Sequence, residues 1–425
     1  MFSRAIRPAT SAIRISRSRT LQTLCRPRPA AAAAPLRPHL QQQHRNASNY
    51  RNLLDEMQNG GLRRNWLSIA TFTTLISIAL GSGIYVVYLY NELVEKPLSV
   101  YPSAVASQIK AALYQASRGN VTEMAAAFKA AITAAEAAGM HPLSDEVAGL
   151  KIECAQFLLK MKEGAYAEKG VQVLEHVLDE SAAGAEFFEK EGRWGDRNKV
   201  LKRAVLLGYK IGEIYQGLEK DREAEEAMSW STETLLEEIK RREGKKVDES
   251  EEGDWFDDIA MSACFEKLAQ QYEKTSQYYL ATPLYLKALS LLPPHTCHAI
   301  TLMNNLGACL SRQQPPPASA ATGAPASVTR EQLLSNAQKW TEKALEIDAR
   351  VVPPIRTAEC DEACVAATHN LGEIARMLGN KKLATEKFDE AMSLAKGLGM
   401  ADGVKAAREG LLKADVMKEG EVSLV

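Results

Sequence analysis

The sequence predicts an all-α protein in which pairs of helices repeat along the chain after one apolar helix. Strand patterns are nearly absent after residue 90, and long segments rich in Ala, Leu, Glu and Lys follow helical spacing. One arrangement of small and aromatic residues also recurs in register. Hydrophobic residues make up 46% and charged residues 25% of the 425-residue chain, which is ordinary for a folded protein.

Charge is distributed unevenly along the chain. The net charge is −1, but residues 1–65 sum to +10 and residues 66–90 carry no charge, which leaves −11 for residues 91–425. Sequence-independent nucleic-acid binding needs a basic face. No nucleic-acid partner is therefore expected for the acidic body.

The first 48 residues have the composition of a mitochondrial presequence. They contain nine Arg, no Lys and no acid, with Ser frequent and Ile and Leu spread among the charges. A disordered basic arm that contacts nucleic acid or lipid is the alternative. Residues 49–65 would then be a short segment in the matrix.

Residues 66–90 (WLSIATFTTLISIALGSGIYVVYLY) predict a transmembrane helix. These 25 uncharged residues would extend about 37 Å as a helix, enough to cross a hydrocarbon core of ~30 Å. Arg63 and Arg64 precede the segment, whereas Glu92 and Glu95 follow it. The positive-inside rule then predicts a single-pass protein of the inner membrane, with its N-terminus in the matrix and its body in the intermembrane space. An outer-membrane signal anchor is the competing topology.

Residues 99–425 predict a domain of helix–turn–helix repeats, for which one segment gives the spacing. Counted from Ala269, an aromatic residue follows at +3, Ala at +12, an aromatic residue at +16 and Ala at +19. The same spacing starts at Gly212, where the +19 residue is Ser231, and at Gly372. Small residues at +0 and +12 would let two antiparallel helices touch.

A fourth copy starts at Gly307, but its second helix is displaced by an insert of about 18 residues. Inserts are predicted near 239–261 and 313–329, and Thr329 with Gln332 offers a capping box for the helix that follows the second. Looser helix pairs are expected at 103–138 and 144–180, and a capping helix at 401–416.

This pattern resembles the tetratricopeptide repeat, a 34-residue helix–turn–helix unit whose stacked copies form a concave binding surface. The spacing places a set of polar residues towards that surface as a candidate peptide-binding groove. They are Lys210, Glu213, Gln270, Asn304, Asn305, His369, Asn370 and Glu373. A solvated polar face is the alternative for each of them.

One subtype of this repeat clamps the C-terminal carboxylate of cytosolic chaperones with Lys, Asn and Arg side chains. Here Asn305 matches that pattern, but Ala366 and Asn370 replace its last two cations. A carboxylate would lack charged donors, so a receptor for chaperone tails is disfavoured.

The stretch from Lys245 to Asp258 (KKVDESEEGDWFDD) is expected to loop out between two repeats. It is either a solvated linker or a docking segment with Trp255 and Phe256 as its anchor.

Signals for catalysis, cofactors and metals are poor. The chain has no P-loop, GxGxxG, HExxH or GxSxG motif, so no enzyme activity and no cofactor is expected. The cluster His295-Thr296-Cys297-His298 is a weak metal candidate, and no metal site is predicted. In an oxidising compartment Cys297 could form a disulfide with Cys360 or Cys364, with buried free thiols as the alternative.

The order of presequence, single span and degenerate repeats resembles the fungal form of the tetratricopeptide-repeat adaptor of the mitochondrial inner-membrane i-AAA protease complex. The resemblance covers almost the whole chain by architecture, and residue motifs support it only in the repeats. It implies a non-enzymatic adaptor that recruits unfolded or membrane proteins to the i-AAA protease, together with a second membrane adaptor. An assembly factor for a respiratory-chain complex and an outer-membrane import receptor or tether are the alternative functions.

Overall fold

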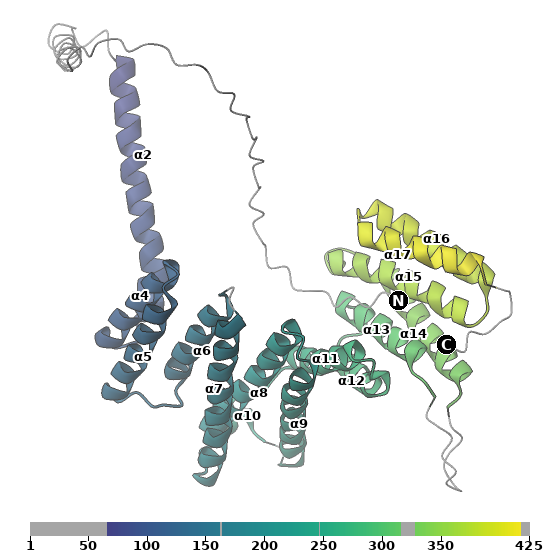
Figure 1. The fold of residues 1–425 in the computed structure, drawn as a ribbon, viewed down its shortest axis with the longest axis horizontal. Helices are drawn as coiled ribbons and strands as arrows, with labels where there is room; N and C mark the ends of the chain where they lie inside the picture. The colour runs from purple at the N-terminus through teal and green to yellow at the C-terminus, as the bar shows by residue number, and fades with distance from the viewer. Residues whose placement is uncertain (1–65, 162–163, 246, 316–327, 418–425) are drawn as a thin grey trace, which may run out of the picture. The chain divides into compact units, whose positions relative to one another are not determined.

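A computed structural model describes residues 66–161, 164–245, 247–315 and 328–417, and every regular element among them is a helix (Figure 1). The expected presequence and matrix segment lie outside these residues and stay predictions. The chain divides into two compact units, one with the apolar helix and one that begins at Ser103. The prediction of an all-α fold is confirmed.

The first unit contains one long helical stretch. Helix α2 (Trp66–Tyr90) continues through a π-helical turn (Asn91–Glu95) into α3 (Lys96–Leu98). Residues Thr71–Leu98 are long and apolar enough to cross a membrane, by length and composition alone. Their apolar side chains face outwards, and Ile84 is 71% exposed. That this helix crosses a membrane remains a prediction.

The second unit is the repeat domain, in which two sets of helices alternate along the chain (Figure 1). The first helices of its pairs are α4 (Ser103–Ser117), α6 (Asp145–Leu159), α8 (Trp194–Gly217), α11 (Asp258–Lys274), α13 (Cys297–Arg312) and α15 (Ala358–Met377). The second helices are α5 (Val121–Ala137), α7 (Gly164–Lys190), α9 (Asp221–Lys245), α12 (Tyr278–Ser290), α14 (Arg330–Asp348) and α16 (Lys381–Gly397). Each helix contacts the next one in order, so the pairs stack as a solenoid.

The spacing of small residues has a direct steric cause. A Cβ atom added at Gly212 in α8 would lie 3.2 Å from the carbonyl oxygen of Ala224 in α9. At Gly307 in α13 the same atom would lie 3.1 Å from the carbonyl oxygen of Ala337 in α14. The backbones of the two helices therefore touch at the +0 and +12 positions, where larger side chains do not fit.

The aromatic side chain at the +16 position packs into the hydrophobic core of the repeat domain. Tyr285 is fully buried in a cluster that also holds Phe265 and Leu302, and this cluster continues from α7 to α15. Burying each such side chain stabilises the fold by about 1.5–3 kcal/mol. One apolar core thus runs through successive repeats, as a solenoid requires.

Both predicted inserts separate helices of the repeat domain. Between α9 and α11 a linker contains the short helix α10 (Glu249–Glu252), and α9 itself runs on to Lys245, inside the range 239–261. Between α13 and α14, Thr329 caps the new helix by accepting a hydrogen bond from the backbone N–H of Gln332. The Gln332 side chain accepts one from the backbone N–H of Thr329, so the predicted capping box is confirmed.

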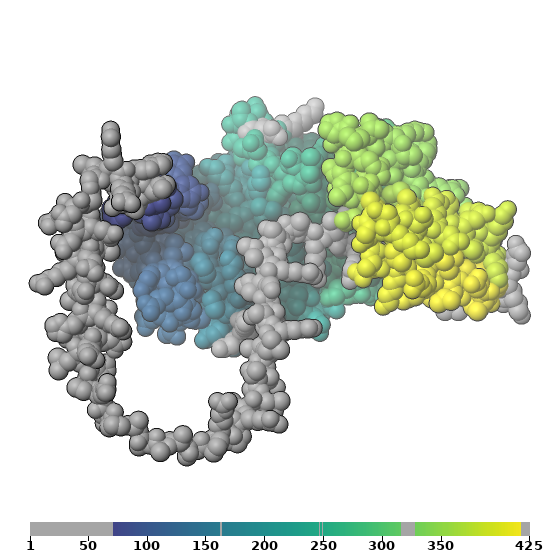
Figure 2. Space-filling model, turned by 90° about the horizontal axis from the view of Figure 1, so that it is seen from above, coloured from purple at the N-terminus to yellow at the C-terminus, as the bar shows by residue number. Residues whose placement is uncertain are grey.

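Helix α17 (Ala401–Asp415) closes the C-terminal end, as expected of a capping helix. Its buried positions Gly403, Ala407, Gly410 and Ala414 follow one face, which packs on α15 and α16. Figure 2 shows the yellow surface of the last helices next to the green surface of α15. The apolar end of the last pair is thereby covered.

Candidate protein-binding surface

The eight predicted groove residues fall into a buried and an accessible group. Asn304 and Asn305 in α13 and His369, Asn370 and Glu373 in α15 are all buried. Lys210 is exposed, and Glu213 and Gln270 are half-buried. The structure therefore brings the residues of α13 and α15 together but not all eight into one exposed surface.

Contacts within the buried group join two neighbouring repeats. The Asn370 Nδ2 atom of α15 donates a hydrogen bond of 2.9 Å to the Asn304 Oδ1 atom of α13, whereas Glu373 pairs with Arg376 of its own helix at 3.0 Å. The side chains of Asn304 and Asn370, two residues of the predicted groove, are thus hydrogen-bonded to each other within the domain. Peptide binding at these positions stays a prediction.

The accessible group lies where α8 meets α11. Lys267 of α11 forms an ion pair with Glu213, which also accepts a hydrogen bond from Lys210 at 3.1 Å. Further along, the side chains of Gln216 and Gln271 are hydrogen-bonded at 2.7 Å. Polar contacts between first helices therefore fix the stacking of these two repeats.

His298 joins three first helices. Its two ring nitrogens each lie 3.0 Å from a carboxylate, that of Glu266 in α11 and that of Glu359 in α15. Hydrogen bonds to these two carboxylates raise the pKa of His298 to about 10 against the opposing effect of burial. The imidazolium acts as a charged bridge across α11, α13 and α15.

Cys297 is bonded to Cys360, so the expected choice between Cys360 and Cys364 is decided for Cys360. The two Cα atoms are 4.6 Å apart and the residues are separated by 63 positions in the sequence. Burial and the nearby Asp348 raise the pKa of the remaining thiol of Cys364 to about 12. With Cys297 in a disulfide and His298 between carboxylates, no metal-binding cluster appears among the described residues.

The aromatic pair of the α9–α11 linker does not face solvent. Trp255 is 8% and Phe256 7% exposed, and both belong to the main core. The Lys202 ammonium group lies 5.2 Å from the Phe256 ring and donates a hydrogen bond to the Trp255 carbonyl oxygen at 3.1 Å. These side chains hold the linker on its own domain and are not an exposed anchor here, so docking of a partner at this segment stays a prediction.

A buried carboxylate binds three arginine side chains next to this linker. Glu238 in α9 accepts hydrogen bonds from Arg197 at 2.8 Å, Arg241 at 2.6 Å and Arg242 at 2.8 Å. Burial alone would raise the pKa of Glu238, but these guanidinium groups outweigh it and lower the pKa to about 2. Arg242 also lies over the Trp255 ring at 5.2 Å, so the network reaches the linker.

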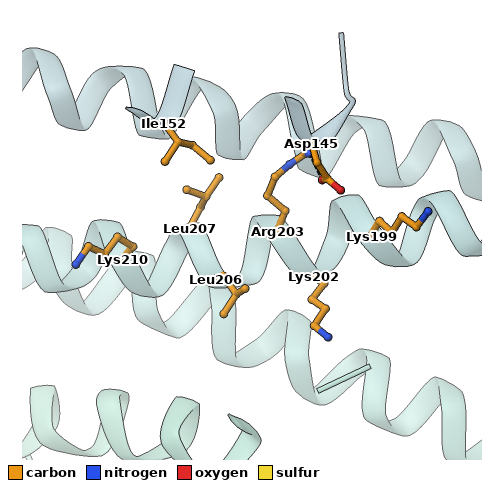
Figure 3. A pocket seen from close by; sticks show the side chains of 8 residues that line it. All are labelled: Asp145, Ile152, Lys199, Lys202, Arg203, Leu206, Leu207 and Lys210. Carbon is orange, nitrogen blue, oxygen red and sulfur yellow. Dashed lines mark hydrogen bonds and ion pairs between the residues drawn. The ribbon is translucent and has the colours of Figure 1, made fainter. Parts of the chain in front are cut away.

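A basic pocket of about 450 Å³ lies between α6 and α8 (Figure 3). We refer to it as the α8 pocket. Its lining residues are Asp145, Ile152, Lys199, Lys202, Arg203, Leu206, Leu207 and Lys210. In Figure 3, Ile152 of α6 and Leu207 of α8 approach each other. Lys199 and Lys210 lie at opposite ends of the pocket residues that α8 contributes.

Two of these cations are held by the fold. Arg203 donates hydrogen bonds to Asp145 and to the Leu143 carbonyl oxygen, both at 2.9 Å, whereas Lys202 is held by the linker. Of the pocket residues, sequence reasoning named only Lys210. The sequence feature that could have indicated the pocket is the spacing of Lys199, Arg203, Leu206 and Lys210 along one helix face. An ordinary solvated helix face has the same spacing.

Among known proteins, one curated relative of this chain is itself repeat-containing. No family model matches the chain. A TPR repeat-containing protein of Schizosaccharomyces pombe is 28% identical over 307 residues, which cover 71% of this chain and 76% of that protein. With its own paired helices and their small-residue contacts, this chain has a tetratricopeptide-repeat fold.

Solved structures of low similarity were also found. BtubC from P. vanneervenii is 12% identical, with 70% of this chain and 91% of that chain covered and a TM-score of 0.36. The complex of the TPR2AB domain of yeast Sti1 with pHSP90 is 12% identical, with 74% and 99% covered and a TM-score of 0.26. The fold assignment rests on the helix pairs of the chain itself.

Proposed function

We propose that this chain is a membrane-anchored, non-enzymatic adaptor that binds unfolded or membrane proteins and presents them to the mitochondrial i-AAA protease. One observation carries the proposal: an exposed apolar helix long enough to span a membrane precedes a tetratricopeptide-repeat domain in the same chain. Repeat solenoids present extended surfaces for protein partners. The relative from S. pombe is likewise a repeat-containing protein.

The proposed topology puts the N-terminus in the matrix and the repeat domain in the intermembrane space. The positive residues before the span and the acidic body after it support this orientation. The Cys297–Cys360 disulfide supports it too, because disulfides persist in oxidising compartments and are rare where glutathione and thioredoxin keep thiols reduced. A second membrane adaptor would contact the span through its small residues, such as Gly81 and Gly83.

Protease protection tests the topology. Protease added to intact mitochondria should leave the repeat domain whole, and rupture of the outer membrane should make it cleavable. Cleavage while the outer membrane is intact would overturn the inner-membrane topology and favour a receptor or tether on the outer membrane.

Affinity purification of the tagged full-length chain tests the partner. Recovery of an AAA protease together with its unfolded clients is the expected result. Recovery of respiratory-complex subunits without an AAA protease would contradict the proposal and favour an assembly factor.

A further inference from the structure

We propose that the α8 pocket binds an acidic peptide segment of a partner protein, with an aliphatic side chain of that segment seated on Leu206. This inference rests on the proposed protein-binding function and adds the chemistry of the partner. It shares Lys210 with the groove predicted from the sequence but otherwise differs from that groove, because its lining side chains come from α6 and α8.

Charge is the first argument. Four cations, Lys199, Lys202, Arg203 and Lys210, line the pocket against one acid, Asp145, in a body whose residues 91–425 sum to −11. The pocket is therefore a local positive field on an otherwise acidic domain. Such a field attracts acidic segments and repels basic ones, including copies of the chain's own basic N-terminal segment.

The two end cations are accessible to a ligand. Lys199 is exposed, and within the described residues it takes part in no ion pair. Lys210 has a side chain that is 58% exposed and, in the part of the chain that the structure describes, pairs with Glu213 alone. Arg203 and Lys202 are already fixed between them by protein contacts, so they add positive charge without needing to be ordered on binding.

The distance between the two end cations indicates how long the bound peptide segment is. Lys199 and Lys210 are eleven positions apart on α8, which corresponds to about 16 Å along a helix axis. An extended peptide advances about 3.3 Å per residue, so about five residues span this distance. The pocket therefore fits a short segment with acids near both of its ends.

An apolar side chain lies midway between Lys199 and Lys210 on α8. Leu206 is 50% exposed, although it sits among charged neighbours, and Ile152 and Leu207 continue the apolar floor towards α6. An aliphatic side chain placed there would remove this surface from water. The combination of an apolar centre and cationic ends selects an acidic segment with a central aliphatic residue over a uniformly acidic one.

Fluorescence anisotropy with the full-length chain in detergent tests the proposal. The probe is a short labelled peptide with a capped C-terminus, in which one leucine is flanked on each side by glutamates. We expect binding that weakens as salt is raised. A peptide with glutamine in place of every glutamate should bind about tenfold more weakly, a difference of ~1.4 kcal/mol.

Variants separate the two parts of the pocket. Lys199→Glu combined with Lys210→Glu should weaken binding about tenfold or more, and Leu206→Ala should weaken it severalfold. Lys382→Glu combined with Lys396→Glu, on the exposed face of α16, is the matched control and should leave binding unchanged. Circular dichroism of each variant checks that the helices are intact.

Four results would overturn the inference. Three of them are absence of binding, equal affinity for the glutamate and glutamine peptides, and equal loss of affinity in the control variant. The fourth is binding of the same peptide only when its C-terminus is left uncapped, because this would indicate an end-specific clamp. The proposed adaptor function fails by a different result, the absence of an AAA protease from the purified complex.

Discussion

The ring of Phe388 in α16 lies directly against Gly410 in α17, so this side chain fills the contact between the two helices and leaves no room for a Cβ atom at Gly410. Gly372 meets the same ring from α15, where an added Cβ atom would lie 2.9 Å from two ring carbons. Phe388 is fully buried, and the His369 ring lies 5.3 Å from it. The C-terminal cap thus depends on two glycines that hold one aromatic side chain between them.

Gly410→Ala should therefore destabilise the cap. Overpacking of this kind costs about 1–3 kcal/mol. Gly397→Ala is the control, because a Cβ atom there meets nothing within 4 Å. Thermal unfolding followed by circular dichroism should show a lower Tm only for Gly410→Ala, and equal Tm values for the two variants would contradict the packing described.

The Glu238 network should make the domain sensitive to acid. The pKa of Glu238 is lowered to about 2 from an ordinary value of 4.5. Its stabilising effect is therefore fully present above about pH 4.5 and is lost as the pH falls towards 2. Urea unfolding at decreasing pH should show this loss.

Glu238→Gln should remove the pH dependence together with about 3 kcal/mol of stability at neutral pH, since it takes one buried carboxylate away from three arginines. Arg241 and Arg242 would keep Glu252 as a counter-charge, and Arg197 would keep Glu189. Glu243→Gln, at an exposed position of the same helix, serves as the control. If both variants unfold at the same urea concentration, the network contributes no stability.

His298 should have the opposite pH dependence. Its pKa is raised to about 10 from 6.5, so its contribution is complete below about pH 6.5 and is lost as the pH rises through 10. NMR of the imidazole carbons should show a protonated ring at pH 8. His298→Gln should lower the Tm near pH 7, and the difference from the wild type should shrink above pH 10. His295→Gln, at the exposed neighbouring position, is the control.

The disulfide should add a measurable share of stability. It closes a loop across 63 positions, for which chain-entropy reasoning gives about 4 kcal/mol. Reductant should lower the Tm of the wild type and of Cys154→Ser but leave Cys297→Ser unaffected. Mass spectrometry of thiol-labelled protein should find Cys297 and Cys360 unlabelled until the protein is reduced. Labelling of Cys297 without reduction would refute the pairing.

Residue spacing was sufficient to predict the paired helices. Gly212 and Ala224 mark a contact between two backbones, and that contact admits only small residues. Local rules also predicted the cap at Thr329, since a capping box lies within four consecutive residues.

Features that depend on distant partners were harder to predict. Trp255 and Phe256 follow a run of acids, which indicates an exposed loop, but Lys202 and Arg242 come from two preceding helices to cover them. Cys360 and Cys364 are one helical turn apart, so the sequence did not distinguish between them. The packing of α13 against α15 decided for Cys360.

The bond between Cys297 and Cys360 makes α14 and its flanking turns part of a covalent ring. A polypeptide that contains such a ring cannot pass in single file through a narrow channel. Once Cys360 is reached from the C-terminus, the chain segment bonded to it at Cys297 must enter the channel at the same time. A protein with this ring resists being threaded from its C-terminus for as long as the bond is intact. Reduction of one bond would turn a chain that cannot be threaded into one that can.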